Sequence, residues 1–170
     1  MAGYGLPNEQ HLSVVLQNSL ETEGYKIEIV NGSVSGSTSS GGLNIAEWTL
    51  SESNIDLMIL CLGANDMLRG INPKETKNNL EEIIKIAKNK NIKVIIAGMI
   101  APTSYGSNYK KSFDKIFYDL SKKYKLQLIP FLLEGVAQKP EFNLSDGMHP
   151  NDQGTIIIGN TLKIAILENL

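Results

Sequence analysis

Hydrophobic side chains follow two alternating patterns along the chain. Longer stretches repeat apolar residues every three or four positions, which is the spacing of one helical face, and short runs between them are rich in β-branched residues. The periodic stretches predict helices over residues 8–23, 42–50, 73–90, 110–124 and 155–167. The short runs predict strands over residues 26–30, 55–62, 92–98 and 126–129.

This alternation predicts an α/β fold, with a parallel sheet covered by helices on both faces. Doubly wound folds normally open with a strand, whereas this chain opens with a loop-like stretch, residues 1–7, and then enters a helix. A chain of 170 residues is long enough to bury one core. We therefore expect a single domain over residues 1–170.

Composition and charge narrow the class of partner. Hydrophobic residues make up 42% of the chain and charged residues 20%, the balance of a soluble globular protein. The formal net charge of -2 gives no electrostatic footprint for nucleic acid or anionic lipid. No apolar run reaches the roughly 18 residues that a membrane span requires. We expect a small-molecule partner, no nucleic acid and no membrane span.

Neither a metal nor a cofactor is predicted. Two histidines and one cysteine do not match zinc-ligand spacings, and no P-loop or dinucleotide fingerprint occurs. The single Cys61 lies in the apolar run 57–62, so we interpret it as a small buried hydrophobic residue.

Two loops that follow predicted strands carry groups suited to stabilising negative charge. Gly36, between two serines, lacks the side chain that would keep a ligand away from a backbone N–H; an ordinary turn is the alternative. Asn65, in Gly63-Ala64-Asn65-Asp66, offers a neutral donor for a developing oxyanion, and an Asx turn is the alternative.

The pentapeptide Asp146-Gly147-Met148-His149-Pro150 contains a candidate base. A carboxylate three residues before an imidazole can hold its Nδ1–H and leave Nε2 free to accept a proton. A purely structural pair of Asp146 and His149 is the alternative.

Residues 31–39, 63–66 and 146–150 together resemble three sequence blocks of the GDSL, or SGNH, hydrolases. Residues 67–70 resemble the small bacterial branch that contains acyl-CoA thioesterases, arylesterases and lysophospholipases. The resemblance covers almost the whole chain. It implies a flavodoxin-like three-layer α/β/α fold, a small acyl ester or thioester as substrate and no cofactor.

The resemblance also implies residue roles. Gly36 N–H and the Asn65 side chain would donate to the oxyanion, His149 would act as general base and then general acid, and Asp146 would orient His149. Apolar candidates for the wall of an acyl-binding site, for which ordinary loop packing is the alternative, are Met67, Leu68, Ile71, Ile100 and Pro102.

The chain departs from the family pattern at its start. The family's Gly-Asp-Ser-Leu block, which follows the first strand and carries the nucleophilic serine, has no counterpart, and residues 1–7 resemble what comes just after it. We therefore expect an N-terminally truncated domain without the first strand and without the nucleophile. Ser33, Ser35 and Ser37 are poor substitutes, because their loop must also supply the Gly36 donor. With a strand missing, we expect the chain alone to be unstable or aggregation-prone.

The leading hypothesis is a serine esterase or thioesterase that acts through an acyl-enzyme, with the nucleophile outside this chain. A non-catalytic remnant or small-molecule binding module of the same fold is the alternative, and an unrelated flavodoxin-like binding domain is a third. The sequence does not predict one compartment: the chain as written is cytoplasmic, and it is periplasmic or exported if a signal peptide lies upstream. The sequence predicts no oligomeric state.

Overall fold

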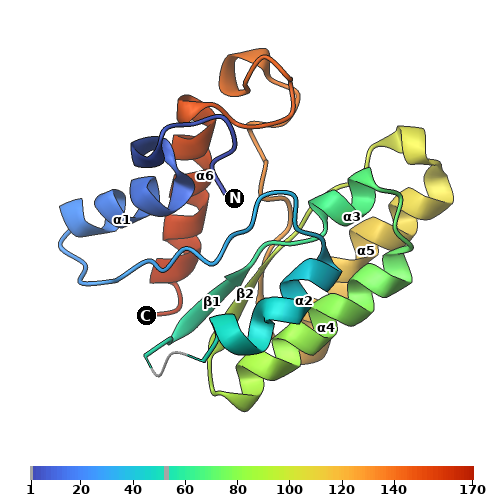
Figure 1. The fold of residues 1–170 in the computed structure, drawn as a ribbon, viewed down its shortest axis with the longest axis horizontal. Coiled ribbons are helices and arrows are strands. Elements are labelled where there is room, and N and C mark those ends of the chain that lie inside the picture. Colours follow the sequence, from blue (N-terminus) through green and yellow to red (C-terminus); the bar gives the residue numbers. More distant parts are fainter. Residues whose placement is uncertain (1, 52–53) are drawn as a thin grey trace. The chain divides into compact units, whose positions relative to one another are not determined.

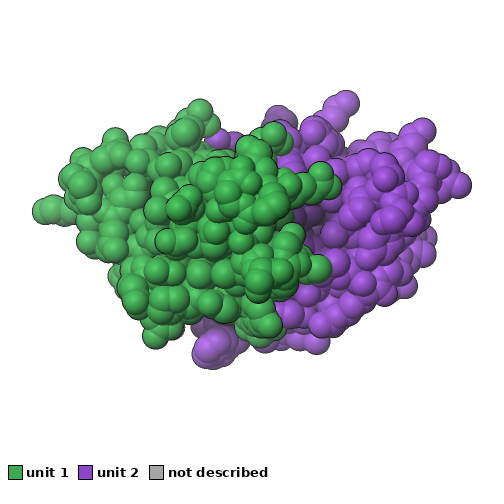
Figure 2. Space-filling view, turned by 90° about the horizontal axis from the view of Figure 1, so that it is seen from above, with its two compact units in different colours: residues 1–35, 132–170 green, residues 36–131 purple. Residues whose placement is uncertain are grey.

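The structure is a computed structural model that describes residues 2–51 and 54–170. Met1, the first residue of the predicted N-terminal loop, lies outside the described residues. The chain divides into two compact units (Figure 2). Unit 1 comprises Met1–Ser35 with Leu132–Leu170, and unit 2 comprises Gly36–Phe131. The expectation of a single domain over residues 1–170 stays a prediction.

Unit 2 contains a parallel sheet in the order β1-β2-β3. The strands are β1 (Leu57–Leu60), β2 (Lys93–Ala97) and β3 (Gln127–Ile129). Ile59 pairs with Ile95, and Ile96 pairs with Leu128. The last four residues of β2 are all buried, as an apolar run inside a parallel sheet requires. These strands and their parallel pairing confirm the predicted α/β class.

The helices of unit 2 are α2 (Ser39–Thr49), α3 (Ala64–Leu68), α4 (Pro73–Asn89) and α5 (Ser107–Tyr124), with a 3-10 turn at Thr103–Tyr105. Helix α4 packs between α2 and α5, and α5 also contacts β2 and β3 (Figure 1). Helix α4 begins where Asn72 accepts the backbone N–H of Lys74, 2.9 Å away, and its buried stripe is Leu80, Ile83, Ile84 and Ala87.

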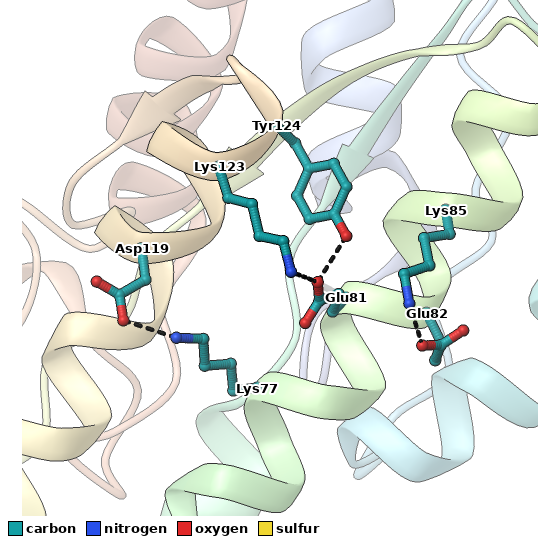
Figure 3. A network of polar contacts seen from close by, with 7 residues as sticks. All are labelled: Lys77, Glu81, Glu82, Lys85, Asp119, Lys123 and Tyr124. Atoms are coloured by element: carbon teal, nitrogen blue, oxygen red, sulfur yellow. Dashed lines mark hydrogen bonds and ion pairs between the residues drawn. The ribbon is translucent and has the colours of Figure 1, made fainter.

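Polar side chains join α4 to α5 along their exposed edge (Figure 3). Lys77 Nζ lies 2.6 Å from Asp119 Oδ2, and Glu81 accepts hydrogen bonds from Lys123 and from the hydroxyl of Tyr124. The bond from Lys123, and then that from Tyr124, lowers the pKa of Glu81. Because Lys77 is partly exposed and Lys123 is exposed, such ion pairs contribute little stability, and the buried stripe holds the two helices together.

Unit 1 contains α1 (Leu12–Thr22) and α6 (Asp152–Leu167), with 3-10 turns at Asn8–Gln10 and Pro140–Phe142. The two helices pack against each other (Figure 1). The apolar residues with helical spacing in α1 are Leu12, Val15, Leu16 and Leu20, and all of them except the partly exposed Val15 are buried. Gly159 of α6 faces α1, and a Cβ there would make ordinary contacts with Val15 Cγ1 at 3.5 Å and Leu12 Cδ1 at 3.8 Å.

The strand predicted over residues 26–30 is wrong: the structure assigns no strand there. A strand needs a neighbour to receive its backbone hydrogen bonds, and here a side chain takes them instead. Gln17 Nε2 donates to the carbonyl of Ile27 at 2.6 Å, and Ile29 N–H donates to Gln17 Oε1 at 2.7 Å. Residues 26–30 are rich in β-branched side chains, but no neighbouring strand among the described residues pairs with them.

Several helices do not begin where the sequence predicts: α1 begins later, after the 3-10 turn at Asn8–Gln10, whereas α2, α5 and α6 begin earlier, α5 without a side-chain cap. Helix α2 begins at Ser39 because Thr38 Oγ1 accepts Gly41 N–H at 3.2 Å, and α6 begins at Asp152 because Asn151 Oδ1 accepts Gly154 N–H at 3.0 Å. In the part of the chain that the structure describes, no helix is both long and apolar enough to cross a bilayer.

Candidate active site

Asp146 and His149 lie on one tight turn of unit 1. Asp146 Oδ2 lies 2.6 Å from His149 Nδ1, while Oδ1 accepts the backbone N–H groups of Met148 at 2.9 Å and His149 at 3.0 Å. Gly147, with φ of 68°, supplies the left-handed residue that the turn requires. The carboxylate thus turns back onto the imidazole as the sequence predicts.

The same contacts explain the acidity of Asp146. Hydrogen bonds lower the pKa of Asp146 to about 2. The largest effect comes from the backbone N–H of His149, followed by the His149 imidazole and the backbone N–H of Met148. The carboxylate is therefore ionised at neutral pH and accepts only. This requires the proton of the neutral imidazole to sit on Nδ1 and leaves the Nε2 lone pair available. Nε2 has no hydrogen-bond partner among the described residues.

The turn is held in place from several directions within unit 1. Leu144 N–H donates to the carbonyl of His149 at 2.7 Å, and residues 143 and 150 form an antiparallel bridge. The buried Asn143 donates to the carbonyl groups of Val136 and Lys139 at 2.8 and 2.7 Å. The ring of Tyr4 packs on the imidazole of His149, with 4.4 Å between ring centroids. The imidazole is thereby restricted in orientation.

Gly36 and Asn65 belong to unit 2 and lie at the starts of two helices. Gly36 is exposed, has φ of 72° and precedes α2 by three residues. Asn65 is the second residue of α3, whose start at the left-handed Gly63 follows the end of β1 by three residues. Neither the Gly36 N–H nor the Asn65 carboxamide has a hydrogen-bond partner among the described residues. Asn65 therefore forms no Asx turn, and both groups are available as donors.

Sequence reasoning missed the role of Asp66, the next residue of the same motif. Its carboxylate is fully buried and accepts from Ser39 N–H at 2.7 Å, from the Ser39 hydroxyl and from Thr76 Oγ1 at 3.1 Å. Asn79 Nδ2 donates in turn to Ser39 Oγ at 3.0 Å. The cluster joins the starts of α2 and α3 to α4. No sequence signal identifies these partners, because they lie 27 and 10 residues from Asp66.

The predicted acyl-wall residues fall into two groups in unit 2. Met67, Leu68 and Ile71 lie in or just after α3, beyond the carboxyl end of β1, and Ile100 and Pro102 follow the neighbouring β2. Leu68 and Ile100 are exposed, by 45% and 43%. An open cavity of about 440 Å³ in unit 1, lined by residues 138–140, 143–145 and 147, contains none of the five.

Neither a reactive cysteine nor a metal site is indicated among the described residues. Cys61 is partly exposed as a residue, whereas we expected it to be buried. Its thiol is nevertheless desolvated by the surrounding protein, which raises its pKa and disfavours the reactive thiolate. Within the described ranges, no group of three or more His, Cys, Asp or Glu side chains is arranged to hold a metal ion.

The chain matches the GDSL-like lipase/acylhydrolase family over residues 1–155, and it belongs to that family. It is 36% identical to an arylesterase of Vibrio mimicus over 152 residues, which cover 89% of this chain and 76% of the arylesterase. It is 32% identical to thioesterase 1/protease 1/lysophospholipase L1 of Escherichia coli over 150 residues, 88% of this chain and 71% of that protein.

The fold gives the same result. The crystal structure of TesA superposes with a TM-score of 0.93 and 32% sequence identity, covering 99% of this chain and 94% of TesA. The resemblance to the SGNH hydrolases and the predicted fold class are confirmed. The roles of the individual site residues stay predictions.

Proposed function

We propose that this chain carries the histidine base, its orienting aspartate and the oxyanion donors of a serine esterase or thioesterase, which hydrolyses small acyl esters or thioesters. The observation that carries the proposal is the 2.6 Å contact between Asp146 Oδ2 and His149 Nδ1, which leaves Nε2 free. The names of the relatives, an arylesterase and a thioesterase, favour these two substrate classes.

In the proposed mechanism His149 moves protons and Asp146 keeps it oriented. Nε2 takes the proton of a serine hydroxyl as its oxygen attacks the acyl carbon, and the resulting imidazolium is stabilised by the ionised Asp146. The imidazolium then protonates the leaving alcohol or thiol as the acyl–oxygen or acyl–sulfur bond breaks. A water molecule, deprotonated by Nε2, releases the acid from the acyl-enzyme and the serine regains its proton.

The proposed oxyanion donors are Gly36 N–H and the Asn65 carboxamide, which have no other partners in the described part of the chain. Neutral donors stabilise the oxygen of the tetrahedral intermediate, where negative charge develops. The proposed acyl wall comprises Met67, Leu68, Ile71, Ile100 and Pro102.

The proposed nucleophile is a serine that none of residues 1–170 supplies. Ser33 and Ser35 lie in the exposed loop that leads to Gly36, and Ser37 Oγ donates to the carbonyl of Thr38 at 3.3 Å. Among the described residues, neither the Ser33 nor the Ser35 hydroxyl is hydrogen-bonded to His149, the proposed base.

The test is the intact mass of the protein from its native source, measured before and after treatment with a fluorophosphonate. Hydrolysis of p-nitrophenyl acyl esters and of acyl-CoA thioesters is measured in parallel. One adduct, on a serine outside this sequence, together with hydrolysis supports the proposal. An adduct on Ser33, Ser35 or Ser37 overturns the assignment of the nucleophile. No adduct and no hydrolysis favour the non-catalytic binding module.

Substitutions separate the proposed roles. His149→Ala is expected to lower kcat about 100- to 10,000-fold, the contribution of a positioned base. Asn65→Ala is expected to lower kcat about 100- to 1000-fold. The control is His11→Gln, because His11 Nε2 contacts the carbonyl of Leu6 at 3.1 Å and has no proposed role in the reaction. Equal losses in the His11 and His149 variants contradict the assignment.

A further inference from the structure

The buried carboxylate of Asp66 has no cationic partner in the described part of the chain. Its compensation comes from the backbone N–H and hydroxyl of Ser39 and from the hydroxyl of Thr76. Ser39 is the first residue of α2, whose N–H has no partner within its own helix. A carboxylate at that position also interacts favourably with the positive end of the helix dipole. Asp66 of α3 thus caps α2.

A second side chain from α3 contacts the same segment at its other end. Arg69, the C-terminal cap of α3, donates from Nη2 to the carbonyl of Gly36 at 2.9 Å. The segment Gly36–Ser39 is therefore held at both ends by α3, through Arg69 and Asp66. Asn65 lies on the same five-residue helix.

We propose that Asp66 and Arg69 are positioning residues that hold the Gly36 N–H and the Asn65 carboxamide in one arrangement, so that both donors reach the same oxyanion. This inference rests on the proposed function. Oxyanion donors are effective because they are oriented before the charge develops, and misplacing a reacting group by about 1 Å can cost about 100-fold in rate. Gly36 needs such restraint, since it is exposed and glycine is the least restricted residue.

Arg69 offers the cleaner test because its side chain is exposed and its loss leaves no buried group unpaired. Arg69→Met removes the donor at similar length, and Arg69→Lys restores a donor. In the protein from its native source we expect Arg69→Met to lower kcat about 10- to 100-fold, with KM changed less than about twofold and an unchanged melting temperature. Arg69→Lys recovers most of the loss. Lys85→Met, which removes an exposed lysine on α4, is the control.

Asp66→Asn tests the other end of the segment. Asparagine keeps one oxygen for the N–H of Ser39 but turns an NH₂ group toward the hydroxyls of Ser39 and Thr76. We expect a lower kcat with little change in KM, together with faster amide hydrogen exchange across residues 36–39. Asp119→Asn, at a partly exposed carboxylate outside the cluster, is the matched control and changes neither kcat nor the exchange rate.

Amide exchange distinguishes failure of this inference from failure of the proposed function. Faster exchange over residues 36–39 in both variants, with an active wild type and reduced kcat, supports the inference. An inactive wild type with the same change in exchange refutes the proposed function but supports the holding role. Unchanged exchange, or an effect of Arg69→Met confined to KM, overturns the inference; the KM effect would mean that Arg69 binds substrate directly.

Discussion

Replacing Asp66 by alanine tests whether the buried cluster stabilises unit 2. The substitution removes the acceptor of three donors: Ser39 N–H, Ser39 Oγ–H and Thr76 Oγ1–H. A buried donor left unsatisfied costs about 1–3 kcal/mol. The backbone N–H cannot turn to another acceptor, whereas the two hydroxyls can rotate, and removal of a buried charge returns part of the cost. We expect a net loss of about 3 kcal/mol in the free energy of unfolding.

Thermal unfolding followed by circular dichroism measures this loss. For a chain of this size, about 3 kcal/mol corresponds to a fall of about 6–12 °C in Tm. Thr76→Val leaves the carboxylate two donors, so it should cost about 1 kcal/mol. Asp119→Ala, which removes a partly exposed carboxylate paired with Lys77, should cost less than about 1 kcal/mol. The reasoning is refuted if Asp66→Ala and Asp119→Ala lower Tm equally.

Three further predictions concern single groups. The NMR signal of the Asp146 carboxyl carbon should titrate with a midpoint near pH 2. The ionised Asp146 therefore contributes its full stabilisation above the ordinary pKa of 3.8, and this contribution is lost as the pH falls through about 2. A measured midpoint of 3.8 contradicts the turn geometry. Gly154→Ala should lower Tm, because the added Cβ would lie 2.2 Å from the carbonyl oxygen of Phe142. Gly159→Ala in the same helix should raise the free energy of unfolding by up to about 1 kcal/mol, because alanine has the higher helix propensity. Equal Tm changes in the two variants would exclude the clash at Gly154. The Cys61 thiol, with its raised pKa, should react with iodoacetamide at pH 8 more slowly than free cysteine does, as intact mass against time would show.

The predictable parts of the fold are those that local pattern determines. Helix α4 begins at the predicted Pro73 and ends one residue early, because a proline in the first turn and a regular apolar stripe are both visible in the sequence. Strand β2 matches because its apolar run is buried inside a parallel sheet. The strand at residues 26–30 fails because pairing is non-local, and the hydrogen bonds of Gln17 to that segment have no signature in sequence.

In the candidate site, too, contacts between residues close in sequence are predictable and contacts between distant residues are not. The contact between Asp146 and His149 spans three residues, so spacing alone predicts it. The contacts of Asp66 span 10 and 27 residues and join three helices, so the motif that contains Asp66 gives no indication of its partners. A buried carboxylate must collect donors from distant segments, and each donor it collects orders the segment that carries it. In this chain one ordered segment leads to Gly36 and the carboxylate's own helix carries Asn65, so the charge that is costly to bury also couples the two proposed oxyanion donors.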